Sequence, residues 1–172
     1  RLAEDVIKTG LELNESYDNL HQFTLYQQYD RKDACRLLNW PKDVSAPMYG
    51  YRVGEHDTPM FITYEKNDDQ KRNAIYNNTL ENGRSLRWYT RVPRHLNSEE
   101  VQRLLHTEGM HIHLFVKRSD AEGKQFFYLG EAKIDPKSVK EELIGAKKKP
   151  AVGMNLLFET PLTSEMYTYL FA

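Results

Sequence analysis

The stretch that decides the fold is HIHLFVKRSDAEGKQFFYLGEAKI, residues 111–134. Its first seven residues alternate, which predicts a strand with Ile112, Leu114 and Val116 on one face and His111, His113, Phe115 and Lys117 on the other. A polar turn over residues 119–124 follows, and residues 125–134 are apolar enough to pair back on the first strand. The stretch therefore predicts a β-hairpin.

Further strands are predicted on both sides of this hairpin. Residues 48–53 and 60–65 flank a polar turn and predict a second hairpin, and residues 86–91 and 152–158 predict single strands. Asp30 is a predicted N-cap for a helix over residues 31–39. Asn97 and Glu100 have the spacing of a capping box at the start of another helix. The polar residues 66–85 predict a long loop.

These elements predict an α+β fold, with a mostly antiparallel, half-open barrel-like sheet of at least six strands and two or three packed helices. Residues 1–23 have the pattern of a helical connector, and residues 24–172 are expected to form the barrel domain. Because the chain begins at Arg1 inside a predicted helix, we expect it to be part of a longer polypeptide.

The composition is that of one folded domain. The chain has 172 residues, 24 Lys and Arg against 25 Asp and Glu, and 11 Tyr, 7 Phe and 2 Trp residues. This aromatic content exceeds that of a disordered chain, and the apolar runs are too short for a membrane span. Cys35 is the only cysteine, which excludes an internal disulfide, and we expect it to be a buried thiol in a cytoplasmic protein.

The most informative segment for function is residues 84–95, which combine arginine with aromatic residues and contain no acid. Guanidinium groups bind phosphates, and aromatic faces stack on bases, so this composition favours a nucleic-acid surface. Alternation predicts Leu86, Trp88 and Thr90 on the opposite face from Arg87, Tyr89 and Arg91. The alternative is a buried Trp88 with a solvated rim of arginines. The predicted DNA-binding residues are Arg84, Arg87, Tyr89, Arg91 and Arg94.

A pocket for a flipped base is a second hypothesis. Tyr49 and Tyr51 flank Gly50 and share one strand face, and together with Trp88 and Thr90 they would line a cavity if the sheet closes on itself. Ordinary barrel packing is the alternative for each of these residues.

Catalysis is a weaker alternative. Asp120, Glu131 and Lys133 have the spacing of carboxylates and lysine in metal-dependent nucleases, although charged pairs are common on hairpins. His111 and His113 lack an obvious set of further metal ligands, so we expect surface imidazoles and no metal. Phosphate-binding loops of the Walker or dinucleotide type are absent from the sequence, and no cofactor is predicted.

Five segments carry a resemblance to a known family: residues 29–33 (YDRKD), 59–64 (PMFITY), 86–91 (LRWYTR), 113–118 (HLFVKR) and 127–130 (FYLG). In order and spacing they resemble the domain of unknown function at the C-terminus of bacterial DEAD/DEAH-box helicases, which is often fused to a phospholipase-D-type nuclease. Lys149-Pro150 and Pro161-Leu162 also fit its pattern, whereas Trp88-Tyr89-Thr90-Arg91 replaces the usual Trp-Gln-Ser-Gln. A fainter resemblance is to modified-base readers of the SRA and PUA-like type.

The resemblance implies a restriction or phage-defence context, with helicase and nuclease modules as partners. Together with the arginine-rich segment it predicts a non-catalytic module that recognises DNA, with a modified base as one candidate target. One alternative is an interaction domain that regulates its own helicase without touching DNA. The other is a metal-dependent nuclease.

Overall fold

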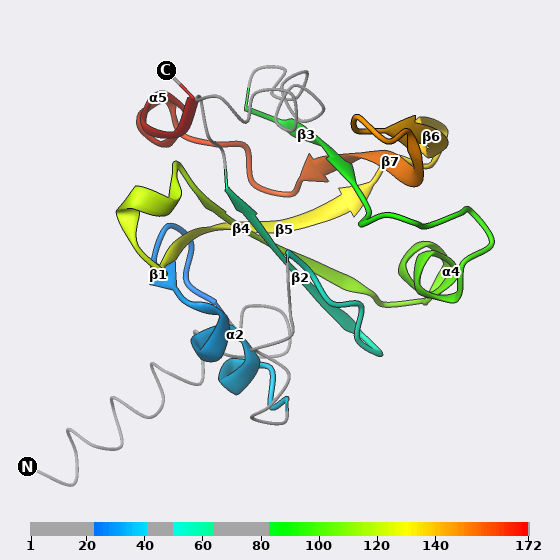
Figure 1. The fold of residues 1–172 in the computed structure, drawn as a ribbon. Helices are drawn as coiled ribbons and strands as arrows, with labels where there is room; N and C mark the ends of the chain where they lie inside the picture. Colours follow the sequence, from blue (N-terminus) through cyan, green and yellow to red (C-terminus); the bar gives the residue numbers. More distant parts are fainter. Residues whose placement is uncertain (1–22, 41–49, 64–82, 172) are drawn as a thin grey trace, which may run out of the picture.

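The computed structural model describes residues 23–40, 50–63 and 83–171. In these residues one mixed sheet curls into a half-barrel, and three helices pack around it (Figure 1). The α+β class and the barrel-like sheet are confirmed. The predicted connector, apart from Phe23, lies outside the described residues, as do Tyr49 and most of the predicted long loop.

The central path of the sheet has the order β2-β4-β5-β7-β3, with β1 paired to β5 and β6 paired to β7. The strands are β1 (Gln28–Tyr29), β2 (Asp57–Thr63), β3 (Ser85–Tyr89), β4 (His111–Lys117), β5 (Phe126–Ile134), β6 (Lys140–Ile144) and β7 (Lys149–Phe158). The helices are α2 (Arg31–Leu37), α4 (Glu99–His106) and α5 (Ser164–Phe171).

β2 has a parallel partner in addition to the expected hairpin. β2 runs parallel to β4 in continuous register, from Asp57 opposite His111 to Thr63 opposite Lys117. The described part of the predicted partner strand, residues 50–53, also pairs antiparallel with β2, through the Tyr51–Met60 bridge and the backbone hydrogen bonds Arg52 N–H to Pro59 O and Phe61 N–H to Gly50 O. The sheet is therefore antiparallel except for its β2–β4 pair.

The β4–β5 hairpin contains one bulge. His113 lies opposite Glu131 and Leu114 opposite Gly130, but Phe115 lies opposite Tyr128, which leaves an extra residue in β5. Gly130 has φ +98°, a conformation that a side chain disfavours. The bulge shifts the alternation of β5 by one residue, so the segments before and after it both keep apolar residues inside the barrel.

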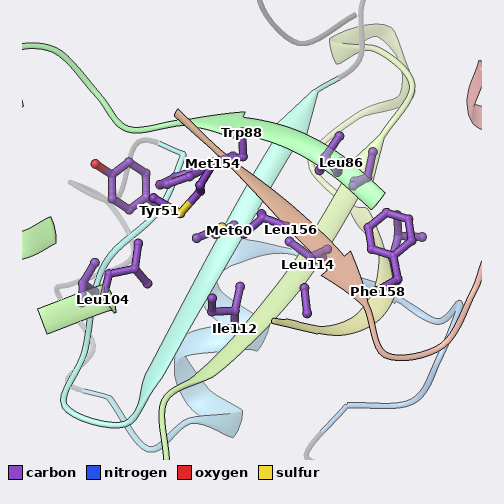
Figure 2. Close-up of a cluster of buried hydrophobic side chains, with 14 of the residues drawn as sticks. Tyr51, Met60, Leu86, Trp88, Leu104, Ile112, Leu114, Met154, Leu156 and Phe158 are labelled. Carbon is purple, nitrogen blue, oxygen red and sulfur yellow. The ribbon is translucent and has the colours of Figure 1, made fainter. Parts of the chain in front are cut away.

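The two faces of the sheet support separate clusters of buried side chains. The barrel core fills the concave side and includes Met60, Leu114 and Leu156 (Figure 2). A second, aromatic cluster lies on the outer face of β4 and β5 and is covered by α2; its buried members are Phe23, Tyr29, Ala34, Cys35, Leu38, Phe61, Phe115, Phe126 and Tyr128. Barrel side chains thus fill the space inside the curl, and α2 protects the opposite side.

The N-termini of α2 and α4 are built differently. In α2 the Asp30 carboxylate accepts from the Asp33 backbone N–H at 2.7 Å, and Asp33 reciprocates, so the predicted N-cap is confirmed as a full capping box. In α4 the N-cap is Ser98, without a side-chain cap, and the expected Asn97–Glu100 box does not form. The Glu100 carboxylate instead accepts from the Tyr51 hydroxyl and from Arg94. None of the described helices has the length and apolar character needed to cross a membrane.

Candidate nucleic-acid interface

Strand β3 presents its alternating residues as predicted. Leu86 and Trp88 are buried in the barrel core, and Arg87 and Tyr89 lie on the outer face, half-buried. The same alternation continues to Thr90, which is buried, and to Arg91, which is not. We define the arginine edge as Arg84, Arg87, Tyr89, Arg91 and Arg94.

Gly153 on β7 lets two side chains of this edge lie flat on the sheet. A Cβ atom at Gly153 would be 2.6 Å from the Tyr89 ring and 2.7 Å from the Arg87 guanidinium. The absence of a side chain there therefore gives Arg87 and Tyr89 room to approach the sheet. The Arg87 guanidinium lies 5.3 Å from the centroid of the Tyr89 ring, in reach of a cation–π interaction.

The Arg87 guanidinium is held by three acceptors from other elements. It donates to the Ser138 carbonyl at 2.9 Å, to the Asn155 side-chain carbonyl at 3.1 Å and to the Glu142 carboxylate at 3.2 Å. These contacts tie β3 to β6, β7 and the turn between β5 and β6. A phosphate would have to share this guanidinium with Glu142.

Arg91 and Arg94 converge on Glu100 of α4. The Arg94 Nε donates to the Glu100 carboxylate at 2.7 Å, and Arg91 pairs with the same carboxylate at 3.6 Å. The hydrogen bond to Glu100 is the main cause that raises the pKa of Arg94. The Tyr51 hydroxyl also donates to Glu100, at 2.8 Å, and the Arg91 guanidinium lies 4.1 Å from the Tyr51 ring centroid. Glu100 is thus the common acceptor of this part of the edge.

Residues 84–95 contain no acid, but in the folded chain carboxylates from other segments lie beside them. Glu100 and Glu142, which sequence reasoning did not include in the site, each lie against arginines of the edge. Arg84 is exposed, and no ion pair joins it to a described residue. The edge is consequently a set of cations partly neutralised by two carboxylates, and its contact with DNA remains a prediction.

The residues predicted to line a base pocket lie in the barrel core. Tyr51, Trp88 and Thr90 are all buried, and the Trp88 side chain points into the core beside Tyr51 and Met154 (Figure 2). The Thr90 hydroxyl accepts from the Val152 backbone N–H at 3.0 Å, which extends the β3–β7 pairing. This placement agrees with ordinary barrel packing, the alternative to a base pocket, for these three residues. Tyr49 lies outside the described residues.

The three residues of the nuclease alternative are not brought into one site. Asp120 pairs with Lys117 at 2.9 Å in the β4–β5 turn, whereas Glu131 contacts His111 at 2.6 Å farther along β5. Lys133 is exposed and lies 3.7 Å from Glu159. Asp120 lines a different surface pocket from Glu131 and Lys133. The described residues contain no group of three potential ligands that could hold a metal ion.

His113 corrects the expectation of a surface imidazole. It is buried, with Nε2 2.8 Å from the Asp57 carboxylate and Nδ1 3.3 Å from the Tyr128 hydroxyl. Burial is also the main cause that raises the pKa of Tyr128. The parallel β2–β4 pair brings Asp57 beside this strand, a contact that alternation alone does not reveal. Cys35 is buried, as predicted.

Comparison with known families gives one match. The model of a family described as a domain of unknown function (DUF3427) covers residues 23–170. No curated protein matches the chain significantly.

Three solved structures share the fold at low sequence identity. SUVH5 SRA in complex with hemimethylated CG DNA has a TM-score of 0.50 and 13% identity, over 84% of this chain and 95% of that one. SUVH5 SRA bound to fully hydroxymethylated CG DNA has a TM-score of 0.51 and 12% identity, over 86% and 96%. The DNA modification-dependent restriction endonuclease AspBHI has a TM-score of 0.51 and 11% identity, over 90% of this chain but 46% of the enzyme. The chain therefore has an SRA-like fold.

Proposed function

The chain belongs to the DUF3427 family of domains of unknown function, and we propose that it is a non-catalytic module that recognises DNA. The observation that carries the proposal is the fold, which extends over most of the chain and is shared with SUVH5 SRA in its DNA complexes and with AspBHI. These neighbours hold or depend on modified DNA, so the target class we propose is duplex DNA that carries a modified base.

The arginine edge is our proposed contact surface for the DNA backbone. Arg91 and Arg94 keep a third or so of their side-chain surface in solvent, at 37% and 28%, so a phosphate can reach them from outside. Arg84 extends the edge toward solvent. Since Glu100 already neutralises part of this charge, the arginine edge should make few contacts with the DNA backbone, and these contacts should be sensitive to salt.

The packing of Tyr51 and Trp88 bears on the hypothesis of a base pocket. The rings of Tyr51 and Trp88 contact each other edge to face with centroids 4.8 Å apart, so a flipped base cannot lie between them as they stand. We therefore propose modified-base recognition for the module without assigning it to these residues.

The wider context is also a proposal. The family resemblance implies attachment to helicase and nuclease modules of a cytoplasmic restriction or phage-defence system, and AspBHI is a restriction enzyme of which the shared fold covers less than half. In such a protein this module would hold the catalytic parts near their target. No cofactor is needed for that role.

Binding assays test the proposal directly. Fluorescence anisotropy with matched duplexes carrying cytosine, 5-methylcytosine, 5-hydroxymethylcytosine or phosphorothioate should give tighter binding to one modified duplex. Affinity should fall with salt, with a slope of about −0.9 per phosphate contact. Equal and salt-independent signals for all four duplexes would contradict DNA recognition.

The internal pairing of Arg87, Arg91 and Arg94 with acids favours one alternative, an interaction domain that regulates its helicase without DNA. In that case the chain should bind the purified helicase part and leave every duplex unbound. For the nuclease alternative, the chain should cleave plasmid DNA with Mg²⁺ or Mn²⁺, and Glu131→Ala should abolish cleavage. We expect intact plasmid.

A further inference from the structure

A basic pocket lies at the beginning of β5, between the start of α2 and the β4–β5 turn. Its volume is about 600 Å³, and it is lined by Asp30, Arg31, Lys32, Lys117, Asp120, Gly123, Lys124 and Phe126. We call it the Phe126 pocket. In the order of the sheet, β7 separates β5 from β3, so this pocket is distinct from the arginine edge.

The pocket forms where β1, which is distant in sequence, meets the β4–β5 hairpin. β1 pairs with the beginning of β5, with Tyr29 opposite Phe126, and so places the start of α2 beside the hairpin. β4 ends at Lys117, next to the turn that carries Asp120 and Gly123. Figure 1 shows β1 and α2 beside the β4–β5 turn. Two of the segments quoted above, residues 29–33 and 113–118, therefore meet at one site.

Lys117 is an unusual residue for this position because its side chain is only 7% exposed. Its ammonium donates to the Gly123 carbonyl at 2.8 Å, pairs with Asp120 at 2.9 Å and lies 4.6 Å from the centroid of the Phe126 ring. An ammonium has three N–H donors, and the described residues accept two of them. The third has no oxygen or nitrogen acceptor among the described residues, so an anion that enters the pocket can accept from it.

Arg31 approaches the same ring from α2. Its guanidinium carbon is 6.0 Å from the Phe126 centroid, and its Nε is buried without an acceptor among the described residues. Buried donors of charged groups are normally paired, because leaving one unpaired is unfavourable. An anion in the pocket would supply the missing acceptor.

The charges of the pocket also favour an anion. Four cations, Arg31, Lys32, Lys117 and Lys124, line it against two carboxylates. Asp30 is already used in the capping box and Asp120 in the pair with Lys117. A guanidinium and an ammonium that line one pocket and lie near the same ring match a phosphate group, which accepts several hydrogen bonds at once.

We infer that the Phe126 pocket binds a phosphate group of nucleic acid, held by Arg31 and Lys117. The volume leaves room for the sugar or base attached to that phosphate. The inference rests on the proposed function for its choice of nucleic acid, and it gives the module a second contact point away from the arginine edge. The phosphate can be an internal phosphodiester or a terminal 5′-phosphate.

In the first experiment the whole chain is titrated with inorganic phosphate, and the titration is monitored by ¹H–¹⁵N NMR. Saturable shifts are expected at residues 31, 117 and 123–126. Arg31→Gln should weaken the apparent affinity at least about tenfold, because it removes a charge-assisted contact. Arg36→Gln removes the same charge from the same helix, at a side chain that is 76% exposed and paired with Asp33, and should leave the affinity unchanged.

Two results would overturn the inference: shifts that do not saturate, or equal loss in Arg31→Gln and Arg36→Gln. The same spectra show whether each variant keeps the native fold, and Arg31→Lys, which retains the charge, should restore part of the affinity. Lys117→Met serves as a second variant of the site and should also lose phosphate binding if it folds.

DNA duplexes then distinguish the source of the phosphate. If the pocket takes a terminal phosphate, a 5′-phosphorylated duplex should bind more tightly than its unphosphorylated form, and Arg31→Gln should remove the difference. If it takes an internal phosphodiester, Arg31→Gln should weaken both duplexes equally and reduce the salt slope by about 1. Failure of the wild-type chain to bind any duplex would contradict the proposed function, whereas the inorganic-phosphate titration decides on the pocket.

Discussion

Trp88 packs its ring edge-on against the ring of Tyr51, with centroids 4.8 Å apart and an angle of 80° between the planes. Tyr51 in turn donates its hydroxyl to Glu100, and Glu100 holds Arg91 and Arg94. A residue of the barrel core is thereby connected, through three successive contacts, to the arginine edge.

Trp88→Ala should destabilise the fold. The ring is only 4% exposed, and truncation of a core tryptophan costs roughly 3 to 5 kcal/mol. Urea denaturation followed by circular dichroism measures the loss. Leu157→Ala, on the exposed face of the adjacent strand, is the control and should cost far less. A Trp88→Ala protein of normal stability that has lost DNA binding would return the residue to the role of a base platform.

Glu100→Gln should strengthen DNA binding. The substitution keeps an acceptor for Tyr51 but removes the charge that neutralises Arg91 and Arg94. A partly exposed ion pair contributes about 0.4 to 1 kcal/mol, which corresponds to a gain of roughly two- to fivefold in affinity. Anisotropy at several salt concentrations measures it.

Glu99→Gln provides the matched control for this prediction. It removes the same charge from the preceding, exposed position of α4 and should change the affinity less. Equal gains in the two variants would mean that only the total charge matters. No gain in either would place the DNA away from the arginine edge.

Cys35 should be inert in the native protein. It is a residue of α2 that packs into the aromatic cluster, and burial raises the pKa of its thiol, so little thiolate is present at neutral pH. Ellman's reagent should react slowly with the folded chain and release one equivalent rapidly in guanidinium chloride. Rapid, stoichiometric reaction without denaturant would show that α2 does not protect the thiol.

The stability of the protein should decline at alkaline pH, partly through Tyr128. Burial, with a smaller effect of Glu131, raises the pKa of Tyr128 above the value of about 10 expected in the unfolded chain. The unfolded state therefore loses its proton first, and stability falls as the pH rises above about 10. Tyr128→Phe should make this decline shallower in urea titrations. Below about pH 9 the free energies of unfolding of the two proteins should differ by a constant amount. Identical slopes of this free energy against pH above about 10 would contradict the prediction.

Sequence patterns predicted the parts of the fold that depend on neighbouring residues. Alternation placed Ile112 and Leu114 inside the barrel and Arg87 outside it, because side chains of a strand point to opposite faces. The Asp30 cap of α2 was predicted for the same reason, since its partner is three residues away.

Contacts between distant segments were not predictable in this way. Glu100 and Glu142 reach the arginine edge from α4 and β6, and Asp57 reaches His113 through the parallel β2–β4 pair. Glu142 and Asp57 are more than 50 residues from the side chains that they contact, and Glu100, six residues after Arg94, reaches it only because α4 folds back beside the edge. A local absence of acid in residues 84–95 therefore predicted more free positive charge than the folded chain presents.

The parallel pairing of β2 and β4 has a consequence for biosynthesis. During translation β2 leaves the ribosome before β3, α4 and β4 have been made, yet β4 is the strand that pairs with it along its whole length. Until β4 is made, the edge of β2 that pairs with it is open in the nascent chain, a state that exposes this strand edge to aggregation. Expression of fragments that end before residue 111 should consequently give insoluble protein, and slower elongation between β2 and β4 should lower the yield of the folded domain.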